Sequence, residues 1–201
     1  MKTETTDAKP YHHGNLRDAL LAAARRLLET EGHTGLSLRK CATAVGVSAT
    51  APQNHFANKA VLLTALAAQG YAELETYMRR SLDQAADRKT RREVALLGYV
   101  TFAQDHPALY ELMFARDRVS SNDPDLMRYV GKCFVILADI SKDFGHFTGD
   151  PATVDAKQQM FLWSLVHGYA QLLTANRLKK DEMLEASILD IIPELKTGGG
   201  P

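Results

Sequence analysis

The sequence predicts an all-α protein made of two helical domains. Apolar residues recur every three or four positions along most of the chain, which is the spacing of amphipathic helices. Prolines and glycines fall between these periodic stretches, where they would end helices. Beyond residue 80 there is no strand-like alternation and no internal repeat. The 201 residues, 45% of them apolar, suffice for a small domain plus a larger one.

The first predicted helix has one apolar face. Its members follow i, i+3, i+4, i+7 spacing and are Leu16, Leu20, Ala23, Ala24, Leu27 and Leu28. The pair Glu31-Gly32 closes this helix, because a glycine after the last turn can take a positive φ. We expect this helix to support the elements that follow it.

The next stretch predicts two short helices that meet at a tight turn. Ser37 is a good N-cap for the first of them. Gly46 then ends that helix, because glycine reverses the chain without steric cost. Ser48 is expected to cap a second helix that begins at about Ala49. Pro52 fits only near the start of this second helix, where its missing N–H would have had no partner.

The second short helix has the composition of a helix that reads DNA. Its outer residues are mostly small or polar, and Phe56 returns the chain to the apolar interior. A major groove about 12 Å wide admits a helix, and Gln, Asn, Thr and Arg side chains read its base edges. Residues at about 37–56 are therefore interpreted as a helix-turn-helix. The candidate DNA-binding residues are Ser37, Arg39, Lys40, Ser48, Ala49, Thr50, Ala51, Gln53, Asn54, His55 and Lys59.

A further helix is predicted to begin at Lys59, after the N-cap candidate Asn58, and to continue to Leu74. The N–H groups and positive dipole end of such a helix attract a phosphate, and the Lys59 ammonium would strengthen that contact. The alternative for Lys59 is a solvated surface lysine.

The formal net charge of zero is unusual for a nucleic-acid binder, but the charge is unevenly distributed. Residues 11–59 carry six basic and three acidic side chains, whereas residues 60–201 carry 16 basic and 19 acidic ones. Any basic face must therefore come from local placement of the N-terminal cations. Affinity for DNA is expected to fall as salt rises.

The rest of the chain reads as helices joined by short polar breaks. The predicted helical ranges are 91–105, 107–115, 124–144, 151–178 and 181–192. The glycine-rich tail at 197–201 is expected to be disordered.

The predicted helix at 151–178 is apolar around much of its circumference, so it must be covered on more than one side. We expect it to pair with the helix at 181–192 and to form a homodimer about a two-fold axis. A dimer would also place two recognition helices about 34 to 36 Å apart, in successive major grooves.

Aromatic and apolar residues of the C-terminal helices form a candidate small-molecule pocket. The candidate ligand-binding residues are Tyr77, Tyr99, Phe102, Met113, Phe114, Phe134, Trp163 and His167. Plain core packing is the alternative for each of them, and for His167 a place in the core or in the dimer interface. The sequence does not indicate which effector would bind.

Several classes of protein and site find no support in the sequence. Cys41 and Cys133 lie far apart and without the spacing of a zinc site, and neither a metal nor a disulfide is expected. No glycine-rich phosphate loop, HExxH or GxSxG motif is present, so we expect neither catalysis nor a cofactor. The chain lacks an apolar run of about 18 residues and a signal-peptide core, which favours the cytoplasm and no membrane contact.

Residues 16–66 resemble the N-terminal DNA-binding domain of the TetR family of transcriptional regulators. The resemblance rests on the first helix, on LSLRKCATAVGVS and on HFANKAVLL. The motif YHHGNL at 11–16, HPALYELMF at 106–114 and LWSLVHGYA, with Trp163, His167 and Gly168, resemble the subgroup that has a Trp-His-Gly C-terminal domain. Family members usually carry an aromatic residue two places before the His-Phe pair. Gln53 stands there in this chain, and glutamine can bond a phosphate or an adenine edge.

The resemblance implies an all-helical homodimer that binds a palindromic double-stranded DNA operator and releases it when a small molecule enters the C-terminal domain. The expected domains are an arm at 1–10, a DNA-binding domain at 11–74 and a regulatory and dimerisation domain at 75–196. We expect a repressor more than an activator. The alternatives are a helix-turn-helix dimer that senses no ligand, and a protein-interaction module that has lost DNA binding.

Overall fold

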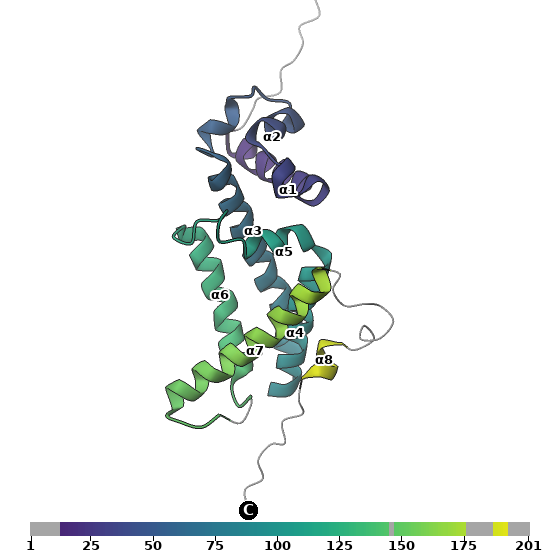
Figure 1. Ribbon diagram of the computed structural model, residues 1–201, viewed down its shortest axis with the longest axis vertical. Coiled ribbons are helices and arrows are strands. Elements are labelled where there is room, and N and C mark those ends of the chain that lie inside the picture. The colour runs from purple at the N-terminus through teal and green to yellow at the C-terminus, as the bar shows by residue number, and fades with distance from the viewer. Residues whose placement is uncertain (1–12, 145–146, 176–186, 193–201) are drawn as a thin grey trace, which may run out of the picture.

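The computed structural model describes residues 13–144, 147–175 and 187–192 of the chain. Within these residues every regular element is helical, which confirms the all-α prediction. The molecule is elongated, with α1 and α2 at one end and the C-terminal helices at the other (Figure 1). The predicted arm at 1–10 and tail at 197–201 lie outside the described residues. No described helix combines the length and apolarity needed to cross a membrane.

The N-terminal end consists of α1 (His13–Gly35), α2 (Leu38–Val45) and the 3-10 helix η1 (Ala51–Asn54). Gly32 interrupts α1 with φ 68° and ψ 178°, so the helix kinks where the sequence predicted its end. Leu20, Leu28, Leu36, Cys41 and Phe56 are fully buried and form the core of this end.

Helix α3 (Lys59–Arg79) joins the two ends of the molecule (Figure 1). Asn58 caps it as predicted, because the Asn58 side chain accepts from the Val61 N–H at 3.0 Å. It packs against α1 and against α4, α5 and α6 of the bundle. The domain boundary predicted between residues 74 and 75 therefore lies inside one continuous helix.

The C-terminal bundle contains η2 (Leu82–Gln84), α4 (Arg88–Asp105), α5 (Pro107–Met113), α6 (Pro124–Ser141), α7 (Pro151–Thr174) and α8 (Ile188–Ile191). Asp87, Asp123 and Asp150 cap α4, α6 and α7 through their carboxylates. Helix α7 packs against α4 and α6 (Figure 1). Residues 176–186, which include the ends of two predicted helices, lie outside the described part.

Helix α6 ends at Ser141, three residues before the predicted end. The buried Arg92 side chain supplies the physical reason, because it donates to the Ile140 carbonyl at 2.8 Å and to the Lys142 carbonyl at 3.1 Å. These bonds satisfy carbonyls that a longer helix would have paired internally. The Arg92 guanidinium also lies over the Phe144 ring, 4.6 Å from its centre.

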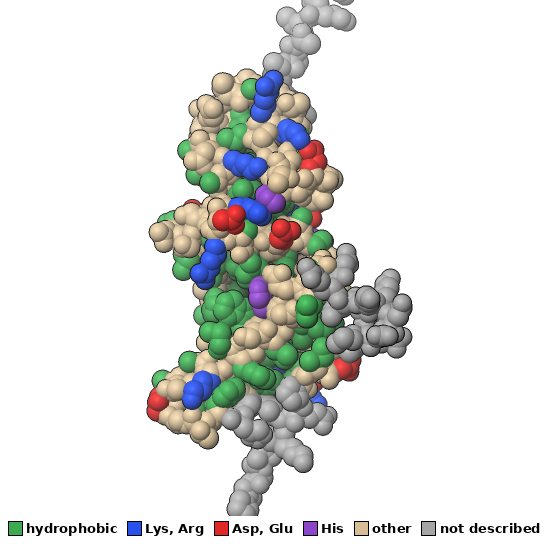
Figure 2. All heavy atoms as spheres, viewed as in Figure 1, with side chains coloured by type: hydrophobic (Ala, Val, Ile, Leu, Met, Phe, Trp, Pro, Cys, Tyr) green, Lys and Arg blue, Asp and Glu red, His purple; other side chains and the backbone are tan. Residues whose placement is uncertain are grey.

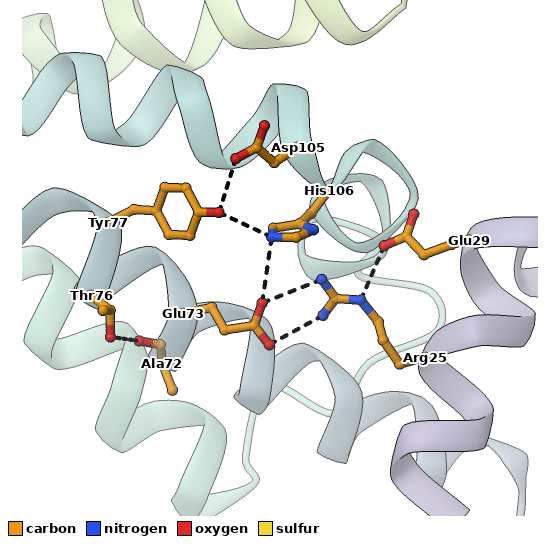
Figure 3. A network of polar contacts seen from close by, with 8 residues as sticks. All are labelled: Arg25, Glu29, Ala72, Glu73, Thr76, Tyr77, Asp105 and His106. Carbon is orange, nitrogen blue, oxygen red and sulfur yellow. Dashed lines mark hydrogen bonds and ion pairs between the residues drawn. The ribbon is translucent and has the colours of Figure 1, made fainter.

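A polar network ties the N-terminal end to the bundle (Figure 3). Arg25 of α1 donates to both carboxylate oxygens of Glu73 on α3, each at 3.3 Å. Glu73 also lies 3.8 Å from His106 Nε2, where α4 meets α5. The Tyr77 hydroxyl donates to Asp105 at 2.9 Å and lies 3.3 Å from the same His106 nitrogen. Because Tyr77 has a single proton to give, its bond with His106 requires a proton on Nε2.

Candidate nucleic-acid interface

The turn between α2 and η1 is built as the sequence predicts. Ser37 caps α2, since its hydroxyl accepts from the Lys40 N–H at 3.2 Å. Gly46 adopts the left-handed conformation with φ 78°, and its N–H bonds the carbonyls at the end of α2. The Val47 N–H then donates to the Ala42 carbonyl at 3.0 Å. The Ser37 cap and the Gly46 turn both depend on hydrogen bonds to backbone groups a few residues away, which is why the sequence alone could locate them.

The second element of the motif differs from the prediction. We expected an α-helix from about Ala49, capped by Ser48, but the structure has a turn followed by the 3-10 helix η1. The Ser48 hydroxyl lies 3.3 Å from the Thr50 hydroxyl and caps no helix. Pro52 explains the difference, because it has no N–H to donate to the carbonyls before it. The chain instead forms i→i+3 bonds, such as Gln53 N–H to the Thr50 carbonyl at 3.1 Å.

The outer surface of this element is polar, and its inner side is held by apolar residues. Pro52 and Phe56 are buried. The exposed candidates for DNA contact are Arg39, Lys40, Ser48, Ala49, Thr50, Gln53 and Asn54, while Ser37, Ala51, His55 and Lys59 are half-buried. With Pro52 and Phe56 turned inward, Gln53 and Asn54 are left on the solvent side. Both amides can donate and accept hydrogen bonds there.

The cations near this surface differ in how far they are already engaged. Lys40 forms an ion pair with Glu31. The Arg17 guanidinium lies over the Phe56 ring, 5.4 Å from its centre. Arg39 is exposed and forms no ion pair with any residue that the structure describes. In the view of Figure 2, Lys and Arg predominate among the charged side chains of the N-terminal end.

Lys59 is at the predicted start of α3, but it makes a contact that the sequence did not indicate. Its ammonium donates to the His33 carbonyl at 2.7 Å, just after the kink in α1. The same histidine bonds the Arg118 guanidinium through Nδ1 at 3.3 Å, and Arg118 belongs to the loop between α5 and α6. Lys59 thus joins α3 to α1, and its ammonium is already engaged in a hydrogen bond that a phosphate contact would have to replace. The phosphate contact stays a prediction, and in this structure it competes with an existing bond.

Replacing Lys59 with methionine should lower stability more than it lowers DNA affinity. The change leaves the His33 carbonyl without its donor, which costs about 1 to 2 kcal/mol and about 3 to 6 °C in melting temperature for a chain of this size. Arg39→Met is the matched control: its melting temperature should stay unchanged, while its DNA affinity and the salt dependence of binding fall. Thermal unfolding and fluorescence anisotropy measure the two effects. A Lys59→Met protein with unchanged melting temperature would contradict this role.

A small cavity of about 40 Å³ lies in the bundle between α3, α4, α6 and α7. Its lining residues are Tyr71, Leu74, Met78, Leu96, Tyr99, Phe114, Cys133, Phe134, Leu137, Trp163 and Val166. Four of the eight candidate ligand residues are among them: Tyr99, Phe114, Phe134 and Trp163. The other seven lining residues are not among the eight candidates, because helical periodicity does not tell which of two buried faces borders a gap.

The other four candidates do not line this cavity. Tyr77 borders a different, more open groove between α3 and α4 and bonds Asp105. Phe102 is fully buried against the Tyr77 and His106 rings. Met113 is buried beside Gly70, where its sulfur would lie 2.6 Å from an added β-carbon. Close packing on α3 therefore accounts for Phe102 and Met113.

His167 lies behind the cavity wall in a cluster with two tyrosines. Its Nδ1 lies 2.8 Å from the Tyr110 hydroxyl and 3.1 Å from the Tyr99 hydroxyl. Burial lowers the pKa of His167 below 6.5 and raises the pKa of Tyr99 well above 10. The imidazole is therefore neutral at pH 7, and its Nδ1 can accept a hydrogen bond from a tyrosine hydroxyl.

This cluster makes stability depend on pH. Because the folded-state pKa of His167 lies below its unfolded value of 6.5, the unfolded chain binds more protons in mildly acidic solution. The neutral His167 contributes to the free energy of unfolding above pH 6.5, and this contribution is lost as the pH falls towards the folded-state pKa of His167. Between pH 7.5 and 5.5 the melting temperature should fall, and it should fall less steeply in His167→Gln. Equal slopes in the two proteins would contradict this assignment.

Two family models match the chain. The model described as bacterial regulatory proteins of the tetR family matches residues 20–66, which include α2, η1 and the start of α3. The model described as a tetracyclin repressor-like C-terminal domain matches residues 93–192. The chain belongs to the TetR family. Its members are DNA-binding regulators and not enzymes. The Trp-His-Gly subgroup stays a prediction.

The chain resembles several known proteins over much of its length. A protein of unknown function from Rhodococcus sp. RHA1 matches with 29% identity and a TM-score of 0.74, over 92% of this chain and 93% of that one. The TetR family transcriptional regulator PfmR from Thermus thermophilus has 17% identity and a TM-score of 0.52, over 79% and 95%, and so shares the fold.

The nucleoid occlusion factor SlmA of Photobacterium profundum is a more partial relative. It is 32% identical over 114 residues, and the match covers 53% of this chain and 58% of that protein.

Among the described residues no group of His, Cys, Asp or Glu could hold a metal ion, and Cys41 and Cys133 are both buried free thiols.

Proposed function

We propose that this TetR-family protein is a transcriptional repressor that binds a palindromic operator as a homodimer and releases it when a small molecule enters the bundle. The observation that carries the DNA-binding part is the exposed pair Gln53 and Asn54 on η1, fixed from below by the buried Pro52 and Phe56. Such amides read base edges in a major groove, and adenine is the base that suits them best. We place the protein in the cytoplasm, where it would meet DNA.

The roles of the surrounding residues follow from their exposure. Thr50, Gln53 and Asn54 would approach the bases, with Ser48, Ala49 and Ala51 close to the groove wall. Arg39 would neutralise a phosphate, because its guanidinium is exposed and has no ion-pair partner in the described part of the chain. Lys40 would first have to leave Glu31. Ser37, His55 and Lys59 are half-buried, so we assign them mainly to holding the motif in place.

A homodimer is supported by apolar side chains that the described residues leave uncovered. Val135 on α6 is 64% exposed and Met160 on α7 is 58% exposed, with Phe161 and Leu172 of α7 also exposed. Figure 2 shows a broad hydrophobic area over the bundle. A second copy covering α6, α7 and α8 would bury this area and align two recognition elements. The interface would thus include α6, beyond the predicted 151–178 and 181–192.

Replacing Asn54 with alanine should remove base discrimination and leave the fold intact. We expect a loss of about 1 to 3 kcal/mol for the preferred duplex and little change for a scrambled one. Fluorescence anisotropy with a duplex from the region upstream of the protein's own gene measures both. Asn122→Ala is the control, because Asn122 is also an exposed asparagine and lies in the loop before α6. An equal loss on both duplexes would assign Asn54 to phosphate contact.

Two observations favour alternatives. The cavity, at about 40 Å³, is small for a drug-sized molecule, which favours a helix-turn-helix dimer that senses no ligand. The 32% sequence identity to the nucleoid occlusion factor over 114 residues favours a DNA-binding role beyond transcription. Protein contacts without DNA binding are the third possibility. Absence of any duplex retention at low salt would favour it, since phosphate contacts are strongest there.

A further inference from the structure

Among the residues that the structure describes, the walls of the bundle cavity hold aromatic rings from four helices and no side chain that is charged at neutral pH. Tyr71 comes from α3, Tyr99 from α4, Phe134 from α6 and Trp163 from α7. A carboxylate or ammonium group that entered would lose its water without gaining an ionic partner, and that loss is costly. The lining therefore selects against charged molecules.

The titratable groups at the cavity support the same conclusion. Burial raises the pKa of the Cys133 thiol to about 12, so this sulfur carries a proton and no charge. Burial also raises the pKa of the Tyr99 hydroxyl, which stays protonated, and lowers the pKa of His167 behind it, which stays neutral. None of these groups would offer a charge to an entering ion near pH 7.

The size of the cavity and the position of Phe134 indicate how a ring would fit. A cavity of about 40 Å³ has room for a few water molecules, whereas an engineered cavity that binds benzene has about 150 Å³. Phe134 is the wall residue that can give way, because it is 38% exposed. It packs edge-on against Trp163, with 5.4 Å between ring centres. A ligand ring that displaced Phe134 could take the same place against Trp163.

Among the described lining residues, Tyr71 has a hydroxyl group that can form a further hydrogen bond. The Tyr71 hydroxyl donates a long hydrogen bond to the Met113 carbonyl, at 3.4 Å. The lone pairs of the Tyr71 oxygen can accept a further hydrogen bond from a ligand. The Tyr99 hydroxyl, in contrast, already lies within bonding distance of Tyr110 and His167. The cavity can thus satisfy one ligand hydroxyl.

We propose that the effector is an uncharged molecule with a single aromatic ring and at most a hydroxyl group, bound between Tyr71 and Trp163 with Phe134 displaced. This inference rests on the ligand response proposed above. Tyr71 and two further lining residues, Leu74 and Met78, lie on α3, the helix that begins beside the DNA-binding surface. Occupation of the cavity therefore acts on the element that positions η1.

Three probes of matched size test the ligand class on the full chain: benzyl alcohol, benzoate and benzylamine. At pH 7 the first is uncharged, the second negative and the third positive. Concentrations of about 1 to 10 mM are appropriate, because ligands this small bind with millimolar dissociation constants. The readouts are the melting temperature and the fluorescence of Trp163, the chain's single tryptophan.

Benzyl alcohol should change Trp163 emission and raise the melting temperature by about 3 °C at tenfold excess over its dissociation constant. Benzoate and benzylamine should do neither. Cys133→Leu narrows the cavity and should abolish the shift. If that variant does not fold, Phe134→Ala, which opens the rim, provides the second test and should strengthen the response. Leu97→Ala is the control: Leu97 lies on α4 outside the cavity, and this variant should respond to benzyl alcohol as the parent does.

Equal shifts with benzoate or benzylamine, no response to benzyl alcohol, or an unchanged response in folded Cys133→Leu would each overturn the proposal. Duplex retention measured with the same probes separates this inference from the proposed function. Binding of benzyl alcohol without DNA release would leave the ligand class standing and refute the ligand response. Release of the duplex by a charged probe would support the ligand response and refute the proposed ligand class.

Discussion

Replacing Gly98 with alanine is expected to destabilise the protein by about 2 to 3 kcal/mol, because the new β-carbon has no space. A β-carbon at this position would lie 2.2 Å from the Tyr77 carbonyl oxygen and 2.7 Å from its carbonyl carbon. Both atoms belong to the backbone of α3, which cannot move aside as the end of a side chain can. The two helices α3 and α4 would have to separate, and contacts along their whole interface would loosen.

Gly131→Ala is the matched control for this prediction. Gly131 lies inside α6, where, apart from its chain neighbours and the backbone of its own helix, no atom of the described residues is within 4 Å of an added β-carbon. Alanine favours helix over glycine by about 1 kcal/mol, so this variant should be as stable as the parent or more stable. Urea unfolding of the three proteins gives the free energies directly. Similar values for Gly98→Ala and Gly131→Ala would show that the close approach of α4 to α3 is not maintained.

Replacing Met160 with glutamate is expected to abolish the dimer and to reduce operator affinity by at least about 100-fold. The Met160 side chain is on the exposed side of α7, within the proposed interface. A carboxylate there would be desolvated by the second copy, which opposes association. Each monomer would then hold only one half-site.

Sedimentation velocity and anisotropy measure the two consequences of this change. Leu97→Glu is the control, because Leu97 is an exposed apolar residue on α4, outside the proposed interface. This variant should remain dimeric and bind DNA as the parent does. A dimeric Met160→Glu protein with normal affinity would place the interface elsewhere.

Much of the fold could be predicted because its signals are local. The caps Ser37 and Asn58 and the turn at Gly46 depend on backbone bonds a few residues away, and the structure has all three. The 3-10 form of η1 was not predicted, because the missing N–H of Pro52 was interpreted as harmless near the start of an α-helix and not as favouring i→i+3 bonds. The end of α6 was missed because Arg92, some 48 residues earlier, determines it.

The candidate site was harder to predict, because long-range contacts decide which side chains are available. Lys59 is at the expected start of α3, but the carbonyl of His33 takes up its ammonium. Tyr77 is aromatic and at helical spacing, yet it faces Asp105 and not the cavity. A sequence pattern identifies the face of a helix, whereas the neighbour that this face meets depends on the packing of the whole bundle.

The most direct test of the central claim is a selection of bound duplexes from a random library, followed by sequencing. A homodimer that reads DNA through η1 should enrich a palindrome whose half-sites are one helical turn apart, about 10 base pairs, or a multiple of it. The Asn54→Ala protein should lose the preference at one position in each half-site. Failure to enrich any sequence, or enrichment of a single asymmetric site that Asn54→Ala also selects, would contradict the account.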